Sequence, residues 1–60
     1  MKPNDDIAYI DRGYAYYSIG EHKKAIMDFD EAIIINPNNC SAYHKRALAY
    51  DAIRDHKKAI

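Results

Sequence analysis

Three histidines and one cysteine are the side chains of this 60-residue sequence that could ligate a metal or act as a nucleophile with its base. Cys40 and His44 lie one helical turn apart, a spacing that suits two ligands or a thiol beside a base. The sequence has no CxxC, no HExxH and no dense set of carboxylates near them. His22 and His56 occupy the same place in a repeated pattern, which favours a structural or solvated role. We therefore expect no metal, no cofactor and no enzymatic activity.

Two lysine pairs recur beside tyrosine-rich stretches, and basic residues with aromatic neighbours can bind single-stranded nucleic acid. The pairs are Lys23-Lys24 and Lys57-Lys58. They fall on different predicted helices from the tyrosines, and the chain carries nine basic and nine acidic side chains, so no global field favours nucleic acid or an acidic membrane. The longest aliphatic run, residues 32–35, is far short of a membrane span. Neither nucleic acid nor a membrane is an expected partner.

The single cysteine cannot form a disulfide within the chain, which favours a reducing compartment. The segment Met1-Lys2-Pro3 also lacks the apolar core of a secretory signal. We therefore expect a cytoplasmic location. Residues 39–41 match the glycosylation acceptor pattern, but without an export signal the match is incidental.

A repeat of 34 residues organises these side chains. When the sequence is shifted by 34 positions, residues 6–26 align with residues 40–60, and 11 of the 21 aligned pairs are identical. A fixed period of this length indicates stacked supersecondary units. The expected organisation is an inter-repeat joint at residues 1–5, a complete repeat at 6–39 and a partial repeat at 40–60. Whether the joint is a natural start or a cut in a longer array stays open.

The residues that carry the period follow an aromatic-x3-Gly-x2-Tyr…Ala-x3-Phe-x2-Ala…Pro spacing, which resembles the tetratricopeptide repeat. The resemblance implies an all-α fold of antiparallel helix-turn-helix hairpins stacked as an α-solenoid. Three arginines depart from the pattern, because Arg12 and Arg46 stand where the family usually has leucine and Arg54 stands where the first copy has glycine. The matching residues are Tyr9, Gly13, Tyr16, Ala25, Phe29, Ala32 and Pro37, then Tyr43, Ala47, Tyr50 and Ala59.

Apolar periodicity predicts helices at about residues 7–19, 22–35 and 41–53. Asp5 or Asp6 is the expected N-cap of the first helix, and Asn39 or Ser41 that of the third. Gly20 can adopt the left-handed conformation that ends a helix. The second helix is expected to stop before the proline that follows it.

Gly13 costs about 1 kcal/mol of helix propensity relative to alanine, which a close approach of the second helix would explain. Arg12 and Arg46 lie near the helix–helix seam, and Asp28 is their expected carboxylate partner. The alternative is that these arginines are simply exposed to solvent. Met27 and Ile34 lie opposite the apolar stripe of the second helix. They are either scattered surface residues or a contact surface on the convex side.

The end of the chain admits two predictions. Asp55 could cap the start of a fourth helix, which would extend for one turn to Ile60. Alternatively, Arg54 in place of glycine would let the third helix continue unbroken to Ile60. In both cases the third helix lacks most of its cover, which a second chain, a further repeat or nothing would supply. Self-association by exchange of helices to form a dimer is one hypothesis.

The resemblance implies that the first helix of each repeat lines a concave groove in which a partner segment lies. A helical wheel independently places Ile10, Tyr14 and Tyr17 on a second flank of the first helix. The expected function is recognition of a peptide or helical segment of a protein, and the alternative is a self-assembly unit whose helix faces pair with other copies. Since Lys45 is the only lysine or arginine among the lining residues, a clamp for a terminal carboxylate is not expected. The expected lining residues are Ile7, Ile10, Asp11, Tyr14, Tyr17, Ser41, His44, Lys45, Leu48 and Asp51.

Overall fold

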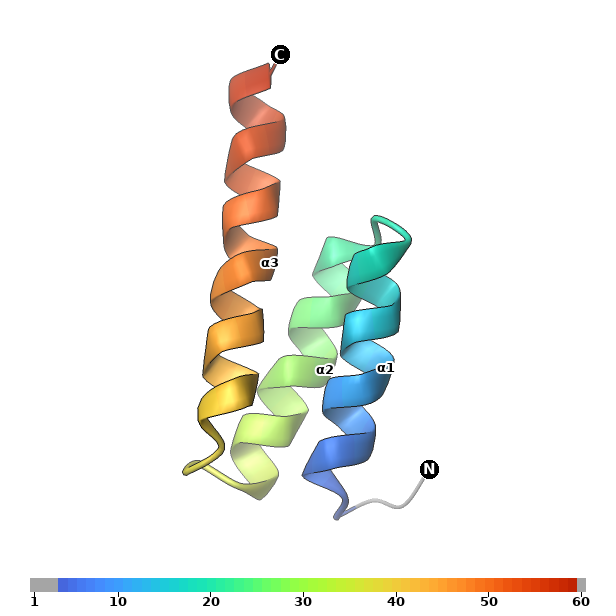
Figure 1. Ribbon diagram of the computed structural model, residues 1–60, viewed down its shortest axis with the longest axis vertical. Coiled ribbons are helices and arrows are strands. Elements are labelled where there is room, and N and C mark those ends of the chain that lie inside the picture. The colour runs from blue at the N-terminus through green and yellow to red at the C-terminus, as the bar shows by residue number, and fades with distance from the viewer. Residues whose placement is uncertain (1–3, 60) are drawn as a thin grey trace.

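The computed structural model describes the backbone of residues 4–59 and the side chains of residues 4–54. Three helices make up this part of the chain: α1 (Asp6–Ser18), α2 (His22–Ile35) and α3 (Cys40–Ala59). Helix α2 runs antiparallel to both neighbours and packs against each of them, whereas α1 and α3 run parallel and touch much less (Figure 1). The prediction of an all-α fold built from antiparallel helical hairpins is confirmed.

Helix α1 begins and ends with two local motifs. The carboxylate oxygen Oδ1 of Asp5 accepts a hydrogen bond from the backbone N–H of Ala8 at 3.1 Å, as an N-cap side chain does. At the other end, Gly20 has a φ of +87°, and the Glu21 N–H donates to the Tyr16 carbonyl at 2.9 Å. The Gly20 N–H donates to the carbonyl of Tyr17 at 3.1 Å, which completes a Schellman motif. This motif turns the chain from α1 into α2.

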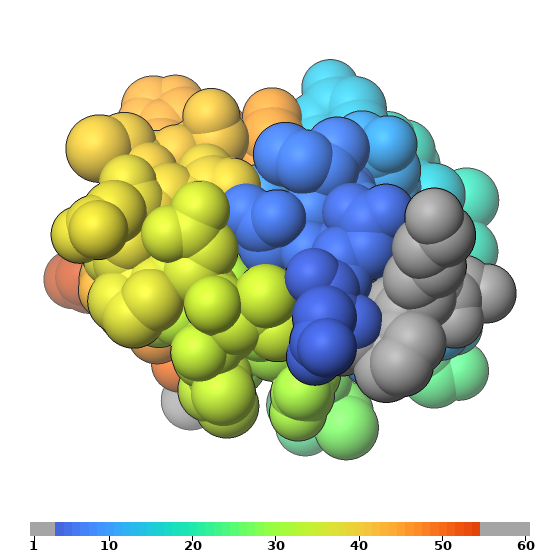
Figure 2. Space-filling view, turned by 90° about the horizontal axis from the view of Figure 1, so that it is seen from below, coloured from blue at the N-terminus to red at the C-terminus, as the bar shows by residue number. Residues whose placement is uncertain are grey.

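The joint between α2 and α3 is fixed by asparagine side chains. Asn39 accepts a hydrogen bond from the Ala42 N–H at 3.3 Å through its Oδ1 and so caps α3. Its amide nitrogen donates to Asp6 Oδ2 at 2.8 Å, and the amide of Asn36 donates to the same oxygen at 3.2 Å. Asp6 therefore ties the start of α1 to the joint, and Figure 2 shows these two segments side by side at this end of the molecule.

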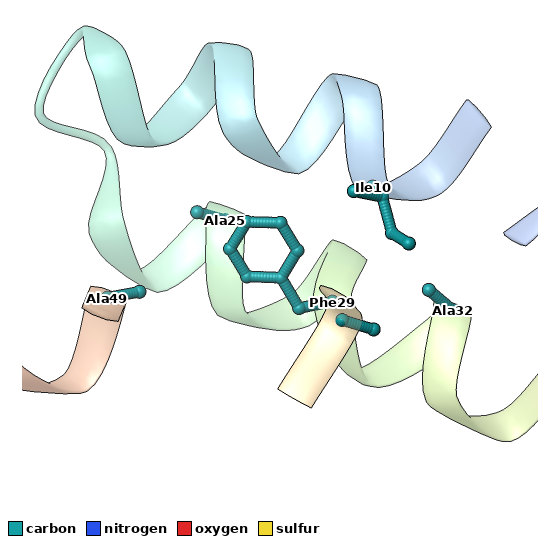
Figure 3. Close-up of a cluster of buried hydrophobic side chains, with 6 residues drawn as sticks. Ile10, Ala25, Phe29, Ala32 and Ala49 are labelled. Carbon is teal, nitrogen blue, oxygen red and sulfur yellow. The ribbon is translucent and has the colours of Figure 1, made fainter. Parts of the chain in front are cut away.

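Phe29 is the centre of the core and is fully buried, with alanines from α2 and α3 around it. Figure 3 shows its ring lying between α1 and α2, with Ile10 directed toward Ala32. The close approach predicted at Gly13 is present, because a Cβ built there would lie 2.6 Å from Phe29 Cε1 and 3.1 Å from Asp28 Cβ. Only the absence of a side chain lets the two helices come this close.

Helix α3 is continuous from Cys40 to Ala59, so the prediction of a separate helix starting at Asp55 is wrong. The alternative of an unbroken helix is confirmed as far as Ala59, and Ile60, where it was expected to end, lies outside the described residues. Gly20 ends α1 in a left-handed conformation, which costs a residue with a Cβ roughly 1–2 kcal/mol. Arg54 stands at that position in the second repeat, and the helical conformation is the cheaper one for it. The end of α3 consequently extends past the α1–α2 turn (Figure 1).

Candidate functional site

An ion pair across the α1–α2 seam holds the first hairpin together. Arg12 donates from Nε to Asp28 Oδ2 at 2.7 Å and from Nη2 to Asp28 Oδ1 at 2.6 Å, in a bidentate arrangement. The guanidinium carbon also lies 5.6 Å from the ring centre of Tyr9 and 6.0 Å from that of Tyr16. Hydrogen bonding to the buried Asp28 raises the pKa of Arg12. The predicted pairing of Arg12 with Asp28 is confirmed.

Arg46 forms a different pair from the one predicted. It donates from Nη1 to Asp30 Oδ1 at 2.9 Å, and this hydrogen bond raises the pKa of Arg46. Asp28 is held by Arg12 on the α1 side of α2. Asp30 lies about 200° further round the helix, on the side where α3 packs. The expectation that Asp28 partners both arginines is therefore wrong for Arg46, because α3 packs on a different side of α2, next to Asp30.

Aromatic side chains of α1, a lysine of α3 and the histidine that begins α2 form a partly exposed surface. Lys45 Nζ lies 4.8 Å from the ring centre of Tyr14, in a cation–π contact. The ring of Tyr14 is stacked on that of Tyr17 with centroids 6.1 Å apart, and Tyr17 meets the ring of His22 edge-on at 5.3 Å. We call this surface, with the neighbouring Leu48, the α1–α3 face.

The other predicted lining residues divide into two groups. Ile10 does not line the α1–α3 face, because it is 5% exposed and belongs to the core cluster around Phe29. It is directed inward at the junction of α1 with α2, where its burial contributes to packing. The remaining residues are exposed on α1 or α3 at helical spacing from Tyr14 or Leu48: Ile7, Asp11, Ser41, His44 and Asp51.

The sequence did not indicate two contacts of the α1–α3 face. It predicted a structural or solvated role for His22, and the structural role is observed, but the contact of the half-buried His22 ring with Tyr17 was not predicted. The cation–π contact of Lys45 with Tyr14 was also not foreseen. The repeat makes Leu48 the equivalent of Tyr14, and Lys45 lies one turn before Leu48 on α3. A basic residue at this position, on a helix parallel to α1, was the available signal.

Cys40 is a free, exposed cysteine, and no three histidine, cysteine, aspartate or glutamate side chains in the described part of the chain are grouped to hold a metal ion. Within the same part, none of the helices is both long and apolar enough to cross a bilayer. The site provides an amphipathic surface of tyrosine, histidine, leucine and lysine, of which tyrosine is the residue enriched at interfaces.

Comparison with known proteins agrees with this architecture. The sequence pattern of the tetratricopeptide repeat matches residues 7–39, and a second tetratricopeptide repeat pattern matches residues 29–60. Neither a curated protein nor a solved structure matches the chain. Each of the two repeat matches covers more than half of the 60 residues, and tetratricopeptide repeats are modules of protein–protein interaction. The chain belongs to the tetratricopeptide repeat family.

Proposed function

We propose that this module binds a peptide or helical segment of another protein on the α1–α3 face. The observation that carries the proposal is the contact of Lys45 with Tyr14 at 4.8 Å, which joins the first helices of two successive repeats into one surface. Tyr14 is 49% exposed and Leu48 is 39% exposed, so both present apolar area to a ligand. Tyrosine combines a large apolar ring with a polar hydroxyl and loses little side-chain entropy on binding.

The charges of the face favour an apolar or helical ligand over a terminal carboxylate. Lys45 already lies against the ring of Tyr14, and the other charged residues near the face, Asp11 and Asp51, would repel an anion. Exposed Ile7 extends the apolar area toward the start of α1. An amphipathic helix whose apolar residues recur every three or four positions fits such a surface.

The test uses peptides selected from a random library against the wild-type chain. Their dissociation constants are then measured on a variant carrying Tyr14→Ala and Leu48→Ala. Both side chains are exposed, so we expect the helical content to persist and the affinity to fall at least tenfold, since loss of central interface anchors typically costs more than about 1 kcal/mol each.

A matched control carries two equally conservative changes on the outer side of α2. Met27 and Ile34 are 67% and 72% exposed there, and Met27→Ala with Ile34→Ala removes a similar apolar area. We expect this control to bind the selected peptides like the wild type. Equal affinities for all three proteins would move the binding site away from the α1–α3 face.

The competing possibility is that the face pairs with a second copy of the chain. Sedimentation velocity over a hundredfold range of concentration separates the two functions, because a monomer leaves the face available to a partner. An oligomer that the Tyr14→Ala and Leu48→Ala variant dissociates would support assembly instead.

A further inference from the structure

The most exposed large apolar side chains of the described chain lie on one side of α2 and at the turn before it. Ile19 is 73% exposed, Ile34 is 72% exposed and Met27 is 67% exposed, more than any other large apolar residue among the described side chains. Met27 and Ile34 are seven residues apart, so they lie within about 20° of each other around α2. Helices α1 and α3 pack on other sides of α2 and also touch each other, so this side faces away from both. Because repeats stack one after another, a repeat before α1 or after α3 would lie beside α2 and not over this side.

Charged residues border this apolar pair in a regular order. Lys23 and Asp30 are seven residues apart and lie along one flank. Lys24 and Glu31 are also seven apart and lie along the other flank. Each flank therefore carries a lysine near the start of α2 and a carboxylate about 10 Å further along the helix. We call this surface the α2 outer face, made of Lys23, Lys24, Met27, Asp30, Glu31 and Ile34.

Two copies of the α2 outer face match each other when their α2 helices run antiparallel about a twofold axis beside Met27. The axis brings residues of the same flank together, and residues equally far before and after Met27 come level. Lys23 then lies within about 1.5 Å of the level of the partner's Asp30. On the other flank, Lys24 lies equally close to the level of the partner's Glu31. A parallel arrangement would instead bring lysine to lysine and carboxylate to carboxylate, so the charges select the antiparallel one.

The same axis brings Ile34 to the turn of the partner. Ile34 is seven residues after Met27, and the residue seven before Met27 is Gly20. A Cβ built on Gly20 would meet no atom within 4 Å, so the turn leaves open space at this point. The exposed Ile19 is its neighbour in the chain. Apolar contacts therefore form at the axis, between the two Met27 side chains, and at both ends, between Ile34 and the turn.

The charged groups of the α2 outer face keep donors and acceptors for a partner. Arg46 donates to Oδ1 of Asp30, and none of the other described side chains donates to Oδ2. Lys24 lies 3.3 Å from Glu21 at the start of the helix, and an ammonium group has three donors. Lys23 forms no ion pair with any of the described side chains.

We propose that the α2 outer face binds the same face of a second copy of the chain, with the two α2 helices antiparallel about a twofold axis beside Met27. The occupant is a second copy because the order of lysines, methionine and carboxylates is complementary to itself. Each chain keeps its own α1–α2 hairpin, so no helix is exchanged. His22, a member of the α1–α3 face, lies about 140° round α2 from Met27, so that face stays open to a ligand in the dimer. The dimer and the ligand-binding function can therefore fail independently.

Sedimentation equilibrium of the full chain tests the dimer. One helix of each copy makes the contact, which is less than the roughly 800 Å² per partner of a standard interface, so we expect a dissociation constant of about 10–100 µM. The mean mass should rise from one chain to two between about 1 µM and about 1 mM. Met27→Asp places two carboxylates against each other at the axis and should abolish the dimer. Met27 is exposed, so circular dichroism should show unchanged helicity for this variant. The Tyr14→Ala and Leu48→Ala variant is the control and should dimerise like the wild type.

Charge reversal on one flank tests the antiparallel register. Lys24→Glu alone turns two attractive contacts into repulsive ones and should weaken the dimer about tenfold. Glu31→Lys alone should weaken it by a similar factor, for the same reason. The double variant restores opposite charges at both contacts, so its dissociation constant should return to that of the wild type. In a parallel dimer Lys24→Glu alone would remove a repulsion and tighten binding.

Three results would overturn the proposal. The first is a wild-type chain that stays monomeric up to about 1 mM. The second is a dimer that Met27→Asp leaves intact, and the third is a dimer that Lys24→Glu alone tightens. If only the Tyr14→Ala and Leu48→Ala variant dissociates the dimer, the second copy binds the α1–α3 face instead.

Discussion

Replacing Gly13 by alanine should destabilise this protein, although the same change stabilises most helices. An alanine Cβ at this position would lie 2.6 Å from Phe29 Cε1, 2.9 Å from Phe29 Cδ1 and 3.1 Å from Asp28 Cβ. Ordinary van der Waals contact begins at 3.4 Å, so the nearest atom must move by roughly 0.8 Å. Phe29 is fully buried, and its ring has no solvent-filled space to move into.

The size of the effect follows from two opposing terms. Alanine gains about 1 kcal/mol over glycine in helix propensity. Overpacking of a filled core costs about 1–3 kcal/mol. The upper half of that range applies here, because the added Cβ would meet two atoms of a buried ring and one carbon next to the α2 backbone. We therefore expect a net loss of about 1–2 kcal/mol in the free energy of unfolding. For a domain of this size that corresponds to a fall in Tm of about 4–8 °C per kcal/mol.

The assay is thermal and urea unfolding followed by circular dichroism at 222 nm. Ala47→Gly is the matched control, because it makes the reverse change at the same repeat position on an exposed part of α3. It should cost about 1 kcal/mol from propensity alone. Adding Phe29→Leu to Gly13→Ala should relieve part of the clash, so the double variant should lose less stability than the sum of the single ones. A Gly13→Ala protein with a raised Tm would refute the close-approach argument.

Three further outcomes follow from the same contacts. Arg12→Gln and Asp28→Asn should be strongly non-additive in a double-mutant cycle of unfolding free energies, because either change alone breaks the bidentate pair; independent effects would contradict the pairing. Arg54→Gly should end α3 early, since glycine adopts the left-handed conformation readily. The magnitude of the ellipticity at 222 nm should then fall. An unchanged spectrum would show that residue 54 does not control where the helix ends. Hydrogen bonds, chiefly from Asn39, lower the pKa of Asp6 from 3.8, so its contribution to stability is fully present above pH 3.8 and is lost as the pH falls through the folded pKa. Asp6→Asn should flatten the pH dependence of Tm in that acid range, and an unaltered acid profile would argue against the link.

Local features of the fold could be predicted from the sequence because they depend on a few neighbouring residues. The caps at Asp5 and Asn39 were predicted as alternatives and confirmed, as was the turn at Gly20. The close approach at Gly13 and the pairing of Arg12 with Asp28 were also predicted from the sequence and confirmed. Both lie within one hairpin, and the repeat pattern fixes the register of its two helices.

Contacts between repeats were predicted less well, since they depend on how α3 is placed on α2. Ile10 has the helical phase of a groove residue, yet it is buried in the core. Arg46 repeats Arg12 in the sequence but meets Asp30, because α3 packs on a different side of α2 from α1. A sequence pattern gives the phase of a side chain on its own helix, and it does not give the helix that lies opposite.

By itself, the sequence determined the first two helices, the start of the third, the candidate caps of α1 and α3 and the family, because the 34-residue period repeats the same local pattern twice. Tertiary structure decided which exposed side chains meet on α1 and α3. The contact of Lys45 with Tyr14 joins residues 31 positions apart on helices that are not neighbours in the chain. Such a contact exists only once α2 has set the separation and direction of the helices on either side of it, which is a property of packing and not of any local pattern.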